Sequence, residues 1–215
     1  MLARRRFLQF SGAAVASALP LPLLARAGGN PAANAPTDAA INAAGDFAAL
    51  EKACAGRLGV TLLDTASSRR VGHRQDERFP MCSTFKSMLA ATVLSQAERA
   101  PALLDRRVPV READLLSHAP VTRRHAGKDM TVRDLCRATI ITSDNTAANL
   151  LFGVVGGPPA GTAFLRASGD AVSRSDRLEP EMNSFAEGDP RDTTTPAAMA
   201  GSLQRVVLGK VLQPA

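Results

Sequence analysis

The spacing of apolar residues along the chain predicts a mainly helical protein that begins with a pair of strands. In residues 37–54 the apolar positions recur at helical intervals among acidic ones, which indicates an amphipathic helix. The apolar run 58–64 predicts a buried strand, and residues 69–74 predict a second strand that returns after a turn. Helical periodicity predicts five more helices, at 83–97, 131–141, 145–152, 159–167 and 196–208.

Two features of this pattern are unusual. Residues 168–194 have little periodicity and are rich in Gly, Asp, Ser, Pro and Thr, and an irregular stretch of that length is usually functional. The pattern predicts no later strand, and a lone two-stranded hairpin is only marginally stable in water. We therefore expect either a helical fold with an accessory hairpin or a chain that ends before its sheet is complete.

The first 27 residues have the pattern of an export signal. Arg4, Arg5 and Arg6 precede a short apolar run that Gly12 and two prolines interrupt, and Ala25-Arg26-Ala27 follows it. The double arginine Arg4-Arg5, followed by one residue and then Phe-Leu, resembles a twin-arginine signal. The alternative is an N-terminal helix of the fold. We expect the twin-arginine export machinery as a partner, cleavage near Ala27, a periplasmic location and no permanent membrane anchor, because the run is too short and broken to span a membrane.

The predicted organisation is therefore a signal peptide at 1–27, a Gly/Ala/Asn/Pro linker at 28–36 and one catalytic domain at 37–215. Of the net charge of +6, the four arginines of the signal peptide supply four, so the remainder carries +2. This is too little for a surface that follows nucleic-acid phosphates. The absence of Tyr and Trp also argues against a module that stacks bases on aromatic rings.

Cysteine and histidine give no metal-binding pattern. The three cysteines, Cys54, Cys82 and Cys136, form no Cys-x-x-Cys, and the three histidines are scattered. An odd number of cysteines leaves at least one without an intramolecular partner. We expect no metal, no cofactor and a monomer.

Three short motifs are candidates for chemistry. Ser83-Thr-Phe-Lys86 places a hydroxyl at a predicted helix start and an amine one turn later, on the same face. A desolvated amine there can accept the serine proton. An N-cap serine with an exposed lysine is the structural alternative.

Ser143-Asp144-Asn145 follows a predicted helix and offers a second hydroxyl and an amide. A plain helix cap is again the alternative. In the irregular stretch, Glu179 and Asn183 are four residues apart and could hold one water, which would make Glu179 a general base. Arg177 could pair with Asp192 and tie the ends of this stretch together, although a solvated charged loop is also compatible.

Together, the order and separations of these motifs resemble the class A serine β-lactamase family, and most closely its exported chromosomal cephalosporinases. The resemblance runs from about residue 47 to 215, and includes 78–81, 130–136, 143–151 and 189–196. It implies an α+β fold of the β-lactamase and penicillin-binding-protein type, a helical domain with an antiparallel sheet, here without the last strands and the C-terminal helix. It also implies hydrolysis of penicillins and cephalosporins, and thus antibiotic resistance.

The resemblance assigns a role to each candidate residue. Ser83 would form an acyl-enzyme, and Lys86, or Glu179 through a water, would take its proton. Ser143 would protonate the leaving lactam nitrogen. Asn145 would hold the drug's side-chain amide, and Glu179 and Asn183 would position the hydrolytic water. His118 would lie at the mouth of the site and stack on substrates, although it could equally be an exposed residue without a role. A cis bond before Pro180 is also expected.

The sequence departs from the family in three ways. It contains no Lys-Thr-Gly or Lys-Ser-Gly. In the family this motif supplies the cation that binds the substrate carboxylate, and the strand that carries it also supplies one of the two oxyanion-hole donors. Cys136 matches a cysteine bridged in some members, but Ala90 stands at the partner position. Cys82 matches a position that other members bridge to the segment lacking here. We expect a truncated copy that is inactive as it stands.

Other functions are compatible with part of this pattern. A penicillin-binding peptidase or a serine glutaminase shares the Ser-x-x-Lys helix, and a β-lactam sensor would acylate without turning over. Glu179 and Asn183 distinguish these from a hydrolase, since neither a transpeptidase nor a sensor needs a deacylating water. A plain helical binding module requires all three motifs to be accidental.

Overall fold

The computed structural model of the chain describes the backbone of residues 38–213 and the side chains from residue 45 to 213. The predicted signal peptide and linker lie outside the described residues. The helices and strands, in chain order, are α2 (Asp38–Cys54), β1 (Val60–Leu63), β2 (Arg70–His73), β3 (Phe79–Pro80), α3 (Phe85–Arg99), β4 (Arg107–Val110), β5 (Lys128–Thr131), α4 (Val132–Thr142), α5 (Asn145–Val155), α6 (Pro158–Ala167), β6 (Thr193–Thr194) and α7 (Pro196–Val207). All the predicted helices and the first strand pair are present within a few residues of their predicted ends.

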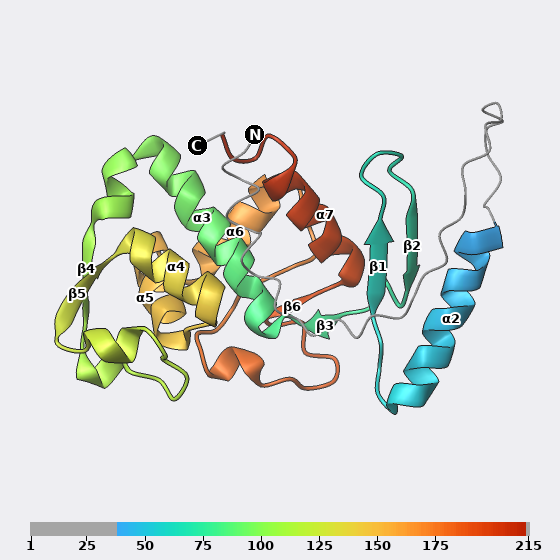
Figure 1. Cartoon of the computed structure of the whole chain (residues 1–215), viewed down its shortest axis with the longest axis horizontal. Helices are drawn as coiled ribbons and strands as arrows, with labels where there is room; N and C mark the ends of the chain where they lie inside the picture. Colours follow the sequence, from blue (N-terminus) through green and yellow to red (C-terminus); the bar gives the residue numbers. More distant parts are fainter. Residues whose placement is uncertain (1–37, 214–215) are drawn as a thin grey trace, which may run out of the picture.

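Helix α3 lies at the centre of a helical body formed with α4, α5, α6 and α7 (Figure 1). Its buried side chains include Phe85, Leu89 and Val93, which pack with Leu135 of α4 and Phe152 of α5 in one apolar core. The rings of Phe85 and Phe152 are stacked with their centroids 5.6 Å apart. Because Phe85 opens α3, this packing fixes the helix end that follows Ser83.

The strands form three antiparallel pairs within the described residues, β1–β2, β3–β6 and β4–β5. The expectation of a single hairpin was therefore wrong. The β4–β5 ribbon pairs Arg107 with Thr131 and Val110 with Lys128, and its polar residues and its proline obscure the alternation that would reveal it in the sequence. The β3–β6 pair joins Phe79 to Thr194, which brings the segment before Ser83 against the end of the irregular stretch.

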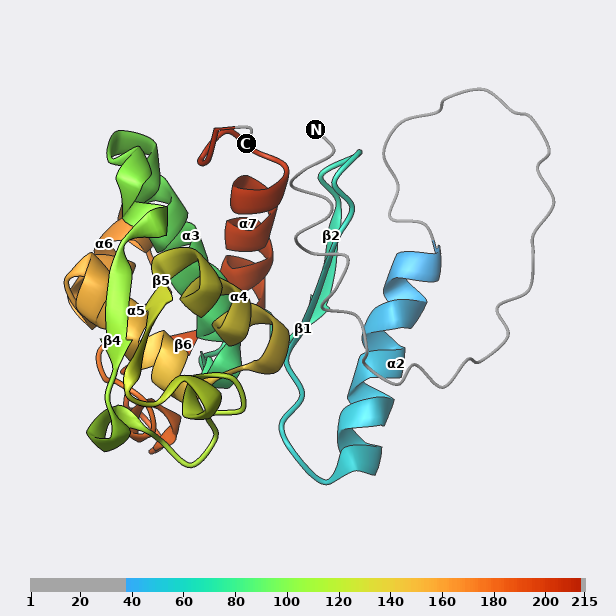
Figure 2. The ribbon, with the colours of Figure 1, turned by 60° about the vertical axis from the view of Figure 1, so that its left-hand side comes forward.

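The β1–β2 hairpin lies to one side of the helical body, with α7 against β1 and α2 against β2 (Figure 2). Gly59, just before β1, lets the chain pass close to Phe79 and Pro196, since a Cβ there would lie 2.4 Å from the Phe79 ring. Across residues 38–213 no single helix is long and apolar enough to cross a membrane, and only α5 and α6 together, bent by 72°, reach that length and composition.

Candidate active site

Ser83 lies in a 3₁₀ turn, Cys82–Thr84, that leads directly into α3. Cys82 has a positive φ of 42°, a conformation that non-glycine residues adopt rarely and at a cost. Thr84 donates its hydroxyl to the Met81 carbonyl, which closes the turn, and the Met81 N–H bonds to the Asp192 carbonyl. These contacts present the Ser83 side chain to solvent at the amino end of a buried helix, where the helix dipole favours negative charge.

Lys86 is 2% exposed, so the alternative of a surface lysine is wrong. Its Nζ lies within hydrogen-bond distance of four acceptors: Ser83 Oγ at 3.1 Å, Ser143 Oγ at 2.9 Å, the Ser143 carbonyl at 2.8 Å and Asn145 Oδ1 at 2.6 Å. It also lies 3.4 Å from Glu179 Oε1. Burial lowers the pKa of Lys86, and the Glu179 carboxylate opposes that shift. An amine with a lowered pKa beside a hydroxyl can accept its proton.

The junction of α4 and α5 positions Ser143 and Asn145. Ser143 ends α4 in the left-handed region, with φ 56°, and Asp144 caps α5 by accepting from the Ala147 N–H. The buried Asp144 carboxylate also accepts from the N–H groups of Val121 and Thr122. This anchored turn directs both side chains to Lys86, and Ser143 Oγ donates to Ser83 Oγ at 2.9 Å.

Glu179 reaches the same centre from the irregular stretch. Its peptide bond to Pro180 is cis, as expected. The Asn149 side chain accepts from the Glu179 N–H at 2.9 Å and donates to the Glu179 carbonyl at 2.8 Å. Asn183 donates its amide to Glu179 Oε2. Glu179 Oε1 is buried and accepts no hydrogen bond from any described residue, and an acceptor in that position ordinarily has a protein or water donor.

Asn149 is the main site residue that the sequence analysis missed. It follows Asn145 by four residues on α5, so the two side chains project from one face of the helix. A polar pair at this spacing on an otherwise apolar helix was the available signal.

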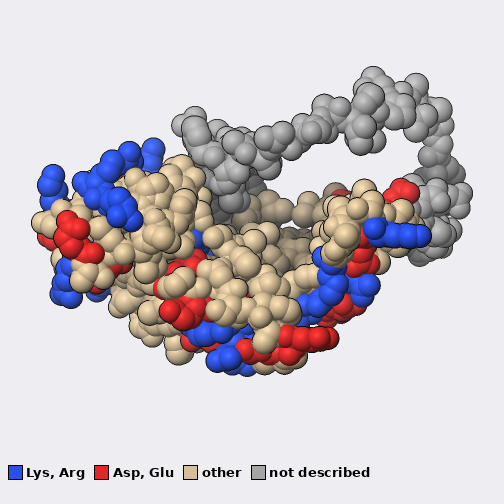
Figure 3. Space-filling view, turned by 90° about the horizontal axis from the view of Figure 1, so that it is seen from below, with Lys and Arg blue, Asp and Glu red and all other residues tan. Residues whose placement is uncertain are grey.

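Arg177 and Asp192 form the expected ion pair, with 2.6 Å between Arg177 Nε and Asp192 Oδ2. Asp192 is fully buried and also accepts from the N–H groups of Asp176 and Arg177. Further pairs, Arg174 with Asp176 and Arg191 with Asp189, lie on the same loop. Figure 3, which views the molecule from the side of this loop, shows basic and acidic side chains next to one another along the lower edge.

His118 lies beside the α4–α5 junction. Its Nε2 donates to the Thr142 carbonyl at 3.0 Å, and its own carbonyl accepts from the Asn145 N–H at 2.9 Å. The ring is exposed. The structure thus brings together Ser83, Lys86, Ser143, Asn145, Glu179 and Asn183, with His118 next to them.

The three cysteines are free thiols. Cys82 is exposed next to Ser83, whereas Cys136 is buried, and burial raises the pKa of its thiol to about 12. Among residues 38–213, no group of three His, Cys, Asp or Glu side chains is arranged to hold a metal ion.

This arrangement can perform nucleophilic acyl transfer. It combines an exposed hydroxyl, a buried amine in hydrogen-bond contact with it, a second hydroxyl that can pass a proton onward, and a carboxylate with one unbonded oxygen. A nucleophile with an adjacent base is the minimum for a covalent mechanism, and the carboxylate adds a candidate base for a water.

Comparison with known proteins gives consistent matches. The model of the "Beta-lactamase enzyme family" matches residues 42–215. Beta-lactamase L2 of Stenotrophomonas maltophilia is 87% identical over 213 residues, which are 99% of this chain and 70% of that protein. Beta-lactamase CTX-M-8 of Citrobacter amalonaticus is 49% identical over 77% of this chain, which here spans 57% of the relative's length.

Solved structures agree with this result. The crystal structure of L2 complexed with relebactam matches with a TM-score of 0.78 and 93% identity, over 84% of this chain and 67% of that one. A reconstructed ancestral class A beta-lactamase matches with a TM-score of 0.78 and 57% identity, over 80% of this chain and 66% of that one.

Proposed function

Because the chain belongs to the beta-lactamase enzyme family, in its class A branch, we propose that it provides the catalytic centre of an enzyme that hydrolyses the β-lactam ring of penicillins and cephalosporins. The chain spans 57% to 70% of the length of the relatives above. The observation that supports hydrolysis best is the unbonded Glu179 Oε1, buried 3.4 Å from Lys86 Nζ.

Acylation begins when Ser83 Oγ attacks the lactam carbonyl carbon. The serine proton passes to neutral Lys86, whose Nζ lies 3.1 Å away, or to Glu179 through a water; both routes are open in this geometry. The tetrahedral intermediate then collapses, and the bond between the carbonyl carbon and the lactam nitrogen breaks. Ser143 donates its proton to that nitrogen and regains one from Lys86, since its Oγ lies 2.9 Å from Lys86 Nζ.

Deacylation needs a water beside the ester. We place that water against Glu179 Oε1, the acceptor that no described residue satisfies, with Asn183 holding the other carboxylate oxygen. Glu179 takes one proton as the water oxygen attacks the ester carbon. The bond to Ser83 Oγ breaks, and the proton taken by Glu179 returns to the serine through Lys86, whose Nζ lies 3.4 Å from Glu179 Oε1 and 3.1 Å from Ser83 Oγ. This step separates hydrolysis from a penicillin-binding peptidase or a sensor, which have no use for a buried base at this position.

Substrate contacts follow from the same geometry. Asn145 would donate its amide to the drug's side-chain carbonyl while its Oδ1 stays bonded to Lys86. His118, exposed next to Asn145, would border the bound substrate. Relebactam, which the similar L2 structure contains, would bind at the same centre.

Residues 1–27 would direct twin-arginine export to the periplasm and be cleaved near Ala27, leaving a monomer. N-terminal sequencing of the periplasmic protein tests the cleavage, and replacing Arg4 and Arg5 by Lys should block export.

The decisive experiment traps the acyl-enzyme. In Glu179→Gln, incubation with benzylpenicillin should add one intact penicillin mass to Ser83, detectable by intact-protein and peptide mass spectrometry over hours. The matched control is Glu181→Gln, which alters an exposed carboxylate two residues away, and Ser83→Ala should give no adduct. The same substitutions in the L2 relative provide a parallel measurement. Failure of Glu179→Gln to form a Ser83 adduct both in this chain and in the L2 relative would falsify the acyl-enzyme assignment.

A further inference from the structure

Residues 114–118, which we call the mouth segment, border the active site next to Asn145. After Asp114 the segment forms neither helix nor strand, and its last two residues, Ser117 and His118, are exposed. The carbonyl of His118 accepts from the N–H of Asn145 at 2.9 Å. The end of the mouth segment therefore lies beside the residue that would hold the side-chain amide of a bound drug.

Thr146 holds the middle of the mouth segment through a single atom. Its Oγ1 accepts from the Leu116 N–H at 2.9 Å and donates to the Asp114 carbonyl at 3.2 Å. Thr146 is 0% exposed and directly follows Asn145 on α5. Because a hydroxyl can donate and accept at the same time, this side chain satisfies two backbone groups of the segment from a buried position.

Arg123 holds the same segment from an exposed position. Its Nη2 donates to the Leu116 carbonyl at 2.8 Å and lies 3.4 Å from the Ser117 carbonyl. The next residue, Arg124, is also exposed, but its side chain makes no hydrogen bond or ion pair with any residue from 45 to 213. Arg124 therefore matches Arg123 in charge and exposure but not in its contact with the mouth segment.

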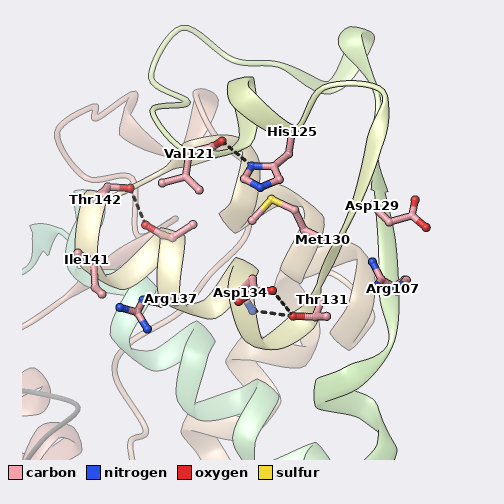
Figure 4. A pocket seen from close by; sticks show the side chains of 11 residues that line it. Arg107, Val121, His125, Asp129, Met130, Thr131, Asp134, Arg137, Ile141 and Thr142 are labelled. Carbon is pink, nitrogen blue, oxygen red and sulfur yellow. Dashed lines mark hydrogen bonds between the residues drawn. The ribbon is translucent and has the colours of Figure 1, made fainter.

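The chain that follows the mouth segment is anchored separately. The N–H of Val121 donates to the buried Asp144 carboxylate at 3.0 Å. Figure 4 shows Val121 and Thr142 together at the end of α4, where both line one cavity. These contacts do not involve the two side chains that hold the middle of the segment, so the chain beyond it should stay in place when either side chain is changed.

We propose that Thr146 and Arg123 are positioning residues for the acylamino side chain of a β-lactam substrate. By fixing the mouth segment, they hold His118 beside Asn145, where that side chain would lie. Neither of them forms a hydrogen bond with Ser83 or with either base among the described residues, so they should affect substrate affinity and not the chemical step. The inference rests on the proposed function.

The test compares two penicillins that differ in this side chain. Benzylpenicillin carries a phenylacetamide, whereas 6-aminopenicillanic acid has an amine in its place. The rate of Ser83 adduct formation is measured against the concentration of each compound in the Glu179→Gln background, both in this chain and in the L2 relative.

Thr146→Val replaces the hydroxyl by a methyl group of similar size. For benzylpenicillin, the concentration that gives half of the limiting rate should rise by about 5- to 10-fold, as expected when one or two supporting hydrogen bonds are lost, while the limiting rate stays the same. The values for 6-aminopenicillanic acid should stay unchanged. Thr146→Ser keeps the hydroxyl and should restore the affinity for benzylpenicillin.

The surface pair provides a second comparison in which folding is not at risk. Arg123→Gln should weaken benzylpenicillin binding in the same direction as Thr146→Val, and Arg124→Gln should leave both penicillins unaffected. Hydrogen exchange of the Leu116 N–H, followed by NMR without substrate, should become faster in Thr146→Val and not in Thr146→Ser, because only the first loses its acceptor.

The outcomes separate this inference from the proposed function. If no adduct forms in Glu179→Gln with Thr146 intact, in this chain and in the L2 relative, the proposed function fails and this inference fails with it. If adducts form, this inference alone is overturned by an unchanged concentration dependence in Thr146→Val, by equal losses for the two penicillins, or by faster exchange throughout α4 and α5, which would indicate general destabilisation.

Discussion

Lys86 Nζ lies 3.4 Å from Glu179 Oε1, and both side chains are almost completely buried, at 3% and 1% exposure. The Glu179 carboxylate therefore influences whether Lys86 is charged. Burial lowers the pKa of Lys86, while the Glu179 carboxylate raises it. The charge on Glu179 thus helps to set the pH above which Lys86 is neutral and can act as a base.

Replacing Glu179 by Gln should move the pH dependence of acylation. The substitution removes the carboxylate that raises the pKa of Lys86 most, so that only the weaker effect of Asp144 opposes the lowering by burial. Neutral lysine then forms at lower pH, so the acid limb of Ser83 acylation should shift to lower pH. The extent of adduct at a fixed early time, measured against pH, checks this in comparison with Glu181→Gln. An acid limb that moves to higher pH would show that Lys86 is not the base.

Asn149→Ala should slow deacylation without preventing acylation. The side chain holds both the N–H and the carbonyl of Glu179, and its loss frees the carboxylate from its position against the water. We expect deacylation to fall by about 10²-fold, the low end for loss of a general base, so that the Ser83 adduct accumulates.

The control for Asn149 is Thr162→Ala. Thr162 also makes two bonds to the loop backbone, to the N–H and the carbonyl of Ser175, but none to Glu179 itself. Similar adduct levels in both variants would mean that loop stability, and not the position of Glu179, controls the step.

Asp192→Asn should destabilise the protein. It removes the buried partner of Arg177, and breaking a buried ion pair usually costs about 3–5 kcal/mol. Because Arg177 is 20% exposed and keeps its bond to the Ser184 carbonyl, we expect about 2–3 kcal/mol by chemical denaturation. Asp189→Asn, which breaks the more exposed pair with Arg191, should change stability much less. An equal loss in both variants would contradict this assignment.

The 215-residue chain should not measurably turn over a chromogenic cephalosporin under conditions where the L2 relative does. The sequence contains no Lys-Thr-Gly, the motif whose lysine is expected to bind the substrate carboxylate. The strand that carries this motif is also expected to supply one hydrogen-bond donor of the oxyanion hole. Loss of one oxyanion-hole donor lowers the rate by about 10²–10³-fold. Turnover at a comparable rate would show that the described residues suffice.

The helices were predictable because each has an apolar face, and the motif residues were predictable because they resemble a family. The burial of Lys86 was not predictable, because the Ser-x-x-Lys motif has the same sequence whether its lysine is buried or exposed. Its environment comes from Ser143 and Glu179, which follow it by 57 and 93 positions in the sequence.

The β4–β5 and β3–β6 pairs were also missed. The two residues of β3 and of β6 are too few to show an alternation, and polar residues and Pro109 obscure it in β4 and β5. Both pairings also depend on partners distant in the chain. Asn149 was missed for a related reason. Its side chain binds the backbone of Glu179, 30 residues away, and no short motif indicates such a contact.

Stability at acid pH should depend on Asp170. This carboxylate is 2% exposed and accepts from Ser173 and from Ser202 of α7. Burial raises its pKa, but these hydrogen bonds outweigh that effect, and the pKa is lowered overall. A lowered folded-state pKa stabilises the protein above the unfolded value, about 3.9, and this contribution is lost as the pH falls through the folded value. Asp170→Asn should therefore be less stable at pH 7 and lose less stability on acidification. Denaturation midpoints between pH 7 and 3 measure this, with exposed Asp105→Asn as control; parallel curves for Asp170→Asn and the unsubstituted chain would contradict it.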